Sequence, residues 1–201
     1  MTRVSNEQRR IDLINAAVEV IAERGVSGAT TRMIADRAES PLTMIHYCFG
    51  AKEDLYFAIF EHLATSQFDE VLHILPGVGL GRAAASLTRQ VGAWVYDTTA
   101  YARAQTELFV WATRQDVDKA RRGYAFTVDV FAAKLREGLR PEDDDHLVDV
   151  IARIIASYGD GLVLHDLAYS DKAIHQTCVD AMAESLEHLA DAHRALPVTT
   201  S

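Results

Sequence analysis

The chain of 201 residues is 49% hydrophobic and 24% charged, which is enough to bury a core and to form one or two domains. Its formal net charge is −9, and residues 1–56 nearly balance, with seven Lys and Arg against eight Asp and Glu, so composition excludes a uniformly basic nucleic-acid-binding surface. Because we find no secretory leader pattern and no apolar run of about 18 residues, we expect a soluble cytoplasmic protein.

Three helices are predicted at the front of the chain, of which the second and third are short. Apolar residues at helical spacing predict the first over residues 7–24. Thr30 is a typical N-cap for a second helix, which we expect to end near Glu39. Ser40 and Pro41 predict the start of the third, because serine can cap free N–H groups and proline fits the first helical position.

The third helix has two different faces. Ile45 and Phe49 lie four residues apart and are expected to pack inward. The opposite face carries a short polar and aromatic surface made of Leu42, Thr43, His46 and Tyr47. Such a surface suits a groove better than a core. We therefore interpret residues 30–52 as a DNA-reading helix-turn-helix.

Lys52 opens the next predicted helix, where a cation does not suit the positive end of the helix dipole. This arrangement costs electrostatic energy, but a phosphate bound by both the lysine and the helix N-terminus would make it favourable. We therefore predict a phosphate contact here. A solvated surface lysine is the alternative interpretation.

Residues 30–55 carry an ordered set of motifs: a T-x-R-x-I-A helix start, an aromatic end of the reading helix and a K-E-x-L start of the next helix. The matching residues are Thr30, Arg32, Ile34, Ala35, Tyr47, Phe49, Lys52, Glu53 and Leu55. This set resembles the DNA-binding domain of the TetR family of transcriptional regulators. The sequence departs from the family pattern at several positions, including Glu39, where glycine is usual, His46, where tyrosine is usual, and Pro41 and Cys48.

The rest of the chain is also predicted to be helical. We expect a connecting helix over residues 52–75, ended by Pro76 and Gly77, and then helices over residues 82–97, 100–115, 117–139, 144–167 and 171–195. The last two have wider apolar coverage than one contact face needs, which predicts burial against a second subunit. The TetR resemblance likewise implies a homodimer in which these two helices form a four-helix bundle with their symmetry mates.

The predicted fold class is all-α. We expect an N-terminal three-helix DNA-binding domain with the helix-turn-helix over residues 1–51. A larger helical domain for ligand binding and dimerisation is expected over residues 52–201, with residues 52–75 as the connecting helix.

Two groups of residues are predicted to contact double-stranded DNA. Leu42, Thr43 and His46 are expected to face base edges, and Thr30, Arg32, Tyr47 and Lys52 are expected to contact phosphates. An ordinary helix surface is the alternative. One short reading helix makes few base contacts, so two of them about 34–36 Å apart, or a multiple of it, would read a palindromic operator.

Aromatic residues of the second region are candidates to line a ligand cavity, together with a few polar groups. The candidates are Trp94, Tyr101, Phe109, Trp111, Tyr124, Phe131, Tyr158, Asp160 and His165. Plain core packing is the alternative, because aromatic residues at helical spacing usually fill a core. Acidic groups beside aromatic rings would suit a cationic ligand.

No metal site, cofactor or enzymatic activity is predicted. The eight histidines do not form a pair four residues apart or a compact set with cysteine. Cys48 and Cys178 lack the spacing of a zinc site or disulfide framework. The sequence also lacks a nucleophile elbow, a phosphate-binding loop and a dinucleotide fingerprint.

We expect a ligand-responsive transcriptional regulator, specifically a repressor that binds a palindromic operator as a homodimer and is released by a small-molecule effector. The effector would shift the helix of residues 52–75 and change the spacing of the two reading heads. The alternative is a helical dimeric module that binds a small molecule or protein without useful DNA binding. The absence of a basic excess at the front of the chain motivates this alternative.

Overall fold

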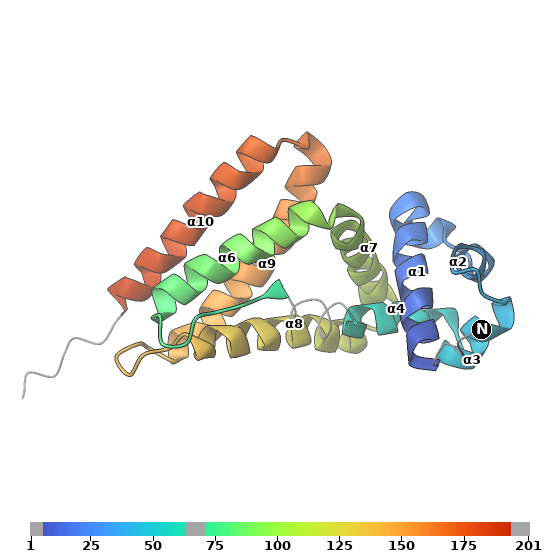
Figure 1. Ribbon diagram of the computed structural model, residues 1–201, viewed down its shortest axis with the longest axis horizontal. Helices are drawn as coiled ribbons and strands as arrows, with labels where there is room; N and C mark the ends of the chain where they lie inside the picture. Colours follow the sequence, from blue (N-terminus) through green and yellow to red (C-terminus); the bar gives the residue numbers. More distant parts are fainter. Residues whose placement is uncertain (1–5, 63–70, 194–201) are drawn as a thin grey trace, which may run out of the picture. The chain divides into compact units, whose positions relative to one another are not determined.

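The computed structural model describes residues 6–62 and 71–193, and within these ranges every regular element is a helix, which confirms the all-α class (Figure 1). The helices are α1 (Asn6–Gly28), α2 (Thr31–Arg37), α3 (Leu42–Phe49), α4 (Lys52–His62), α6 (Leu80–Asp97), α7 (Thr99–Gln115), α8 (Val117–Glu137), α9 (His146–Tyr169) and α10 (Lys172–Ala192). None of the described helices is long and apolar enough to cross a membrane.

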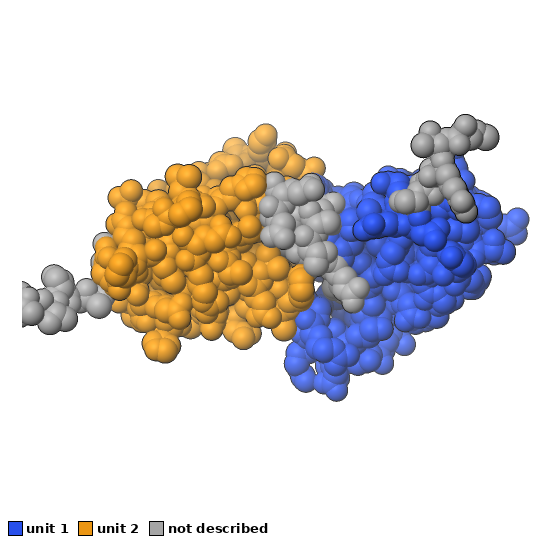
Figure 2. Space-filling model, turned by 60° about the horizontal axis from the view of Figure 1, so that its bottom comes forward, with its two compact units in different colours: residues 1–65, 98–123 blue, residues 66–97, 124–201 orange. Residues whose placement is uncertain are grey.

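The chain divides into two compact units (Figure 2). Unit 1 combines residues 1–65 with residues 98–123, so α7 and the start of α8 pack with the front helices. Unit 2 combines residues 66–97 with residues 124–201. The division therefore does not follow chain order, because one later helical segment belongs to the unit that holds the helix-turn-helix.

In unit 1, α1 carries a continuous buried stripe and packs against α7 and α2. Its regular geometry breaks at Gly25, whose φ of 70° and ψ of 165° lie in a region that is essentially restricted to glycine. The break frees the backbone N–H of Val26, which donates to Glu107 Oε2 of α7 at 3.1 Å. A backbone group released by the kink is thus satisfied by a side chain 81 residues away.

The capping prediction is confirmed at α2 and wrong at α3. Thr30 is the N-cap of α2, and its Oγ1 accepts from the Met33 backbone N–H at 3.2 Å. At α3 the N-cap is Pro41, with no side-chain cap, and the helix begins at Leu42. Ser40 instead completes the end of α2, because its backbone N–H donates to the Ala35 carbonyl at 2.9 Å.

The connecting helix begins at Lys52, as predicted, but its predicted extension to residue 75 is wrong. The described part of α4 ends at His62, residues 63–70 lie outside the described residues, and residues 72–75 are not helical. Burial alternates here, with Leu72 and Ile74 buried and their neighbours exposed, which is the period of extended chain. The side chain of Gln90 accepts from the His73 backbone N–H at 2.7 Å and donates to its carbonyl at 2.9 Å.

The later helices agree with the sequence predictions to within a few residues. The helix predicted over residues 117–139 ends at Glu137, and the one predicted over residues 144–167 runs from His146 to Tyr169 without interruption. The final helix ends at Ala192, and residues 194–195 of its predicted range lie outside the described part.

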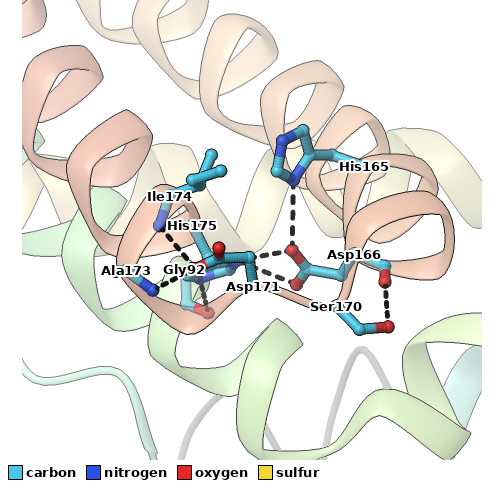
Figure 3. A network of polar contacts seen from close by, with 8 residues as sticks. All are labelled: Gly92, His165, Asp166, Ser170, Asp171, Ala173, Ile174 and His175. Carbon is cyan, nitrogen blue, oxygen red and sulfur yellow. Dashed lines mark hydrogen bonds and ion pairs between the residues drawn. The ribbon is translucent and has the colours of Figure 1, made fainter.

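A buried polar network joins three helices of unit 2 (Figure 3). His175 of α10 places Nδ1 2.8 Å from Asp166 Oδ2 of α9 and Nε2 3.1 Å from the Gly92 carbonyl of α6. Both ionisable side chains are buried. Since the Gly92 carbonyl oxygen can only accept, His175 Nε2 donates to it, and Nδ1 faces the carboxylate with one proton between them.

The network lies where α6 and α10 approach closely. A Cβ atom at Gly92 would come within 2.6 Å of Val179 Cγ2, so only glycine fits this position without a shift. His165 Nδ1 lies 3.4 Å from Asp166 Oδ1 at the outer side of the network. The polar groups therefore fix how three helices of unit 2 meet.

Candidate nucleic-acid interface and ligand site

The helix-turn-helix is held by a small buried core. Ile34 and Ala35 anchor α2, and Ile45 and Phe49 anchor α3, which confirms that these residues of α3 pack inward. Between the two helices Glu39 adopts a φ of 49° in the left-handed region. The turn therefore takes the backbone conformation that glycine adopts most easily, but with a side chain present.

The opposite face of α3 is open to solvent. Leu42 is 42% exposed and Tyr47 is 69% exposed, and Thr43 and His46 are exposed as well. Large apolar and aromatic groups that remain exposed on one face of a helix are available to a partner. Contacts between these four residues and DNA bases or phosphates remain a prediction.

Lys52 sits between two helix starts. Its Nζ donates to the Ala29 carbonyl at 2.6 Å, next to the N-cap Thr30, and lies 5.1 Å from the centre of the Tyr56 ring. An ammonium group has three donors, so the Ala29 bond leaves capacity for a further acceptor. Arg32 is exposed in the first turn of α2. Phosphate binding by Thr30, Arg32 and Lys52 remains a prediction.

Two other arginines of unit 1 have structural roles that sequence analysis missed. Arg37 binds Glu19 Oε2 at 2.9 Å and Glu23 Oε2 at 2.8 Å, which ties α2 to α1 and lowers the pKa of Glu23. Arg10 donates to the Cys48 carbonyl at 3.0 Å and lies 4.5 Å from the centre of the Phe49 ring. These partners are 14 to 39 positions apart in the sequence, so no local motif reveals them.

The predicted ligand residues fall into both units. Trp94, Tyr124, Phe131, Tyr158, Asp160 and His165 belong to unit 2, and Tyr101, Phe109 and Trp111 belong to unit 1. Within unit 1 the Tyr101 hydroxyl donates to Asn15 Oδ1 of α1. Trp111 packs edge-on against Tyr56 of α4, with ring centroids 5.1 Å apart. These contacts connect α7 with both α1 and α4.

In unit 2 the structure brings Tyr124 and Asp160 together, with the tyrosine hydroxyl donating to Asp160 Oδ2 at 3.0 Å. Asp160 as a whole residue is exposed, but partial burial of its carboxyl raises its pKa, and the bond from Tyr124 offsets part of that rise. Trp94 and Phe131 are buried, as expected for either a cavity wall or a plain core.

Tyr158 is the unsatisfied member of the predicted ligand set. Its hydroxyl is buried and has no hydrogen-bond partner among the described residues. Burial raises the pKa of Tyr158 to about 12, so the hydroxyl keeps its proton and remains a donor. A buried donor without an acceptor is costly, which makes this hydroxyl a reasonable contact for a ligand or a water molecule.

Two open grooves are lined by described residues other than the predicted ligand set. One of about 460 Å³ lies in unit 1 between α1 and the α2–α3 turn and includes Arg9, Glu39 and Pro41. The other, of about 510 Å³, lies in unit 2 along α6 and includes Arg82 and Arg89. Among the described residues, no group of three or more His, Cys, Asp or Glu side chains is arranged to hold a metal ion.

Comparisons with known proteins agree with this architecture. A family model described as bacterial regulatory proteins, tetR family, matches residues 13–59, which include α2, α3 and most of α4. A crystal structure of a transcriptional regulator from Rhodococcus sp. Rha1 is similar, with a TM-score of 0.72 and 16% identity, covering 93% of this chain and 98% of that one.

Two curated relatives are named transcriptional repressors. The nicotine-responsive repressor HdnoR of Paenarthrobacter nicotinovorans is 32% identical over 113 residues, which is 56% of this chain and 58% of the relative. The repressor NicS of Pseudomonas putida is 35% identical over 60 residues, which is 30% of this chain and 28% of the relative. The chain thus matches somewhat over half the length of the first relative and about a quarter of the second.

Proposed function

We propose that the chain is a transcriptional regulator of the TetR family, whose model it matches over residues 13–59, and that it is a ligand-responsive repressor that binds a palindromic operator as a homodimer. The observation that carries this proposal is the exposed polar and aromatic face of α3, held outward by buried Ile45 and Phe49. The proposal assigns no catalytic activity and places the protein in the cytoplasm with the DNA.

The proposed DNA contacts divide into two kinds. Leu42, Thr43 and His46 would face base edges in the major groove, and Thr30, Arg32, Tyr47 and Lys52 would contact phosphates. Lys52 supports this division, because its bond to the Ala29 carbonyl holds the ammonium beside the start of α2. A helix N-terminus and a cation together favour a phosphate at that place.

Dimerisation is proposed through α9 and α10. These helices leave several large apolar side chains exposed, among them Leu164 at 60%, Leu167 at 44%, Tyr169 at 69% and Ile174 at 46%. A partner subunit that covers them would remove this apolar surface from water. A two-fold dimer would then present two copies of α3 to successive major grooves.

The proposed effector is a small molecule bound by unit 2, with Tyr158 and the Tyr124–Asp160 pair as polar contacts. The name of the nicotine-responsive relative supports small-molecule control, and an acidic group beside aromatic rings suits a cationic ligand. We keep the proposed boundary between DNA-binding and effector domains near residue 52, with α4 as the element that transmits the change.

Contacts at the start of α4 support that role. The Tyr56 hydroxyl donates to the Val26 carbonyl at 3.3 Å, and Lys52 donates to Ala29, so α4 is tied to both the end of α1 and the start of α2. Trp111 of α7 packs on Tyr56. A shift of α4 would therefore move the helix-turn-helix with it.

The second candidate is a helical dimeric module that binds a small molecule or a protein without useful DNA binding. It is favoured by two arginines of unit 1 that other residues of the chain engage, because Arg37 is held by Glu19 and Glu23 and Arg10 by the end of α3. Gel-shift measurements separate the two candidates.

The full chain should retard duplex DNA flanking its own coding region, with a specific band that weakens as salt rises. Lys52→Ala should weaken binding to all sequences and reduce the salt slope by about one per subunit. Thr43→Ala should change the preference at one base-pair position of each half-site. Lys134→Ala, which alters a half-buried lysine of α8, should leave both properties unchanged. Absence of any specific band at low salt would favour the second candidate.

A further inference from the structure

His46 is held in one orientation on the exposed face of α3. Its Nδ1 lies 3.0 Å from the Gly50 carbonyl oxygen, and the Gly50 backbone N–H donates to the His46 carbonyl at 3.0 Å. The Gly50 carbonyl can point back toward the His46 imidazole because Gly50 adopts a φ of 76° and a ψ of −77°, a conformation open to glycine. The two residues therefore form a closed clasp at the end of α3.

The clasp determines which ring nitrogen carries the proton. A backbone carbonyl can only accept, so the hydrogen bond requires Nδ1 to be the donor. In the neutral imidazole the other nitrogen, Nε2, then has a free lone pair and acts only as an acceptor. His46 is exposed, so Nε2 is available to a partner.

This fixed polarity distinguishes His46 from its neighbours on α3. The hydroxyls of Thr43 and Tyr47 can rotate to donate or to accept, and Leu42 does neither. Residues 41–49 contain no Lys or Arg that could bind guanine. His46 is thus the one side chain of this exposed face whose hydrogen-bonding direction is set by the fold.

We infer that His46 presents Nε2 as an acceptor in the major groove and selects a base with an amino group, adenine or cytosine, over guanine or thymine at one position of each half-site. The major-groove edges of adenine and cytosine offer the N6 and N4 amino donors, whereas guanine O6 and thymine O4 are acceptors. Two facing acceptors would leave both groups unpaired, which is unfavourable. This inference rests on the proposed DNA-binding function.

The first test is selection of binding sites from a random duplex library at about pH 8, where an imidazole is neutral. The full chain should select a palindrome in which one base pair of each half-site loses its preference in His46→Ala, while the other positions stay unchanged. The adenine or cytosine of that base pair is the expected partner of Nε2. Tyr47→Phe is the matched control on the same face, and it should weaken binding without altering any preference.

The second test removes the amino group from the DNA. Replacing the selected adenine by purine, or the selected cytosine by a pyrimidinone that lacks the N4 amino group, should weaken binding of the unaltered protein about fivefold for each modified half-site. The same replacement should have no effect on His46→Ala.

Two results would overturn the inference and leave the proposed function standing: a selected palindrome that is identical for His46→Ala, or unchanged binding of the unaltered protein when the amino group is removed from the base pair that depends on His46. Selection of no sequence at all by the unaltered protein would overturn the proposed function and the inference with it.

Discussion

Glu39 and Ser170 both hold their backbone in the left-handed region, with a φ of 49° at each. Ser170 compensates locally, because its hydroxyl and its backbone N–H both donate to the Asp166 carbonyl at the end of α9. Glu39 has no comparable side-chain bond to its own turn among the described contacts, and it stands where the TetR pattern usually has glycine. The α2–α3 turn therefore carries local strain.

Replacing Glu39 by glycine should stabilise unit 1. Relief of the left-handed conformation is worth about 1–2 kcal/mol, and the greater freedom of glycine in the unfolded chain costs about 0.4–1 kcal/mol. The difference predicts a gain of about 1 kcal/mol in the free energy of unfolding of Glu39→Gly, measured by urea denaturation.

The control is Glu39→Ala, which removes the carboxylate but keeps Cβ and hence the strain. Its free energy of unfolding should stay within about 0.5 kcal/mol of the unaltered protein. An equal gain for alanine and glycine would assign the effect to the lost negative charge and reject the backbone explanation.

At the scale of elements, short sequence motifs predict the helix starts that are set by contacts between residues close together in the sequence. Thr30 caps α2 through a hydroxyl three residues from its partner, and Lys52 opens α4, so both starts follow from the sequence alone. Residues 72–75 were predicted as helix because leucines recur at helical spacing, yet Leu72 and Ile74 alternate with exposed neighbours. Their extended conformation depends on Gln90, 17 positions from His73, which local periodicity does not include.

The Asp166–His175 network illustrates the same limit for the interior. Both residues lie on helices that the sequence predicts, but the acceptor at Gly92 is 83 positions from His175. The sequence therefore predicts the helices and leaves open the polar contact that fixes their packing. For α3, by contrast, the sequence does predict which side chains are buried and which are exposed, because both sets follow from a single helical period.

Removing one member of the Asp166–His175 pair should destabilise the fold strongly. His175→Leu leaves a buried carboxylate without its partner, and Asp166→Leu leaves a buried imidazole without its own, so each should lower the free energy of unfolding by about 3–5 kcal/mol. The double variant should lose less than the sum by at least about 1 kcal/mol, because it leaves neither the buried carboxylate nor the buried imidazole without its partner. Urea denaturation of the unaltered protein, the two single variants and the double variant, all at the same protein concentration, measures this coupling energy.

The Arg89–Asp180 ion pair between α6 and α10 offers a control that shares helix α10 with the Asp166–His175 pair. Its atoms lie 2.9 Å apart, but both side chains are 44% exposed. Solvent screening should limit its coupling energy to less than about 1 kcal/mol. Similar coupling energies for the two pairs would mean that burial does not strengthen the Asp166–His175 contact.

At the scale of the whole molecule, charge and apolar surface are distributed differently. Unit 2 holds 8 Lys and Arg against 17 Asp and Glu and so carries the whole net charge of −9, whereas unit 1 holds 12 of each. The acidic groups would keep unit 2 away from phosphates and leave DNA binding to unit 1. The exposed apolar side chains of α9 and α10 lie in unit 2. A dimer built on these helices would therefore join subunits through the part of the chain that DNA repels.

Leu164→Glu tests this arrangement. A glutamate at the two-fold interface would bring two carboxylates into a water-poor contact, and we expect the dimer dissociation constant to rise by roughly 100-fold or more. Val117→Glu is the matched control, because Val117 of α8 is 54% exposed, close to the 60% of Leu164. Light scattering after size exclusion should find a monomer for Leu164→Glu and a dimer for Val117→Glu.

Gel shifts on the same two proteins connect the oligomeric state with function. If two copies of α3 must bind together, monomeric Leu164→Glu should lose most of its affinity for a palindromic site but bind an isolated half-site as weakly as the unaltered protein does. A monomer that still bound the palindrome tightly would show that one reading helix suffices. A Leu164→Glu dimer would instead place the subunit contact on another surface, and the exposed residues of α9 and α10 would then need a different partner.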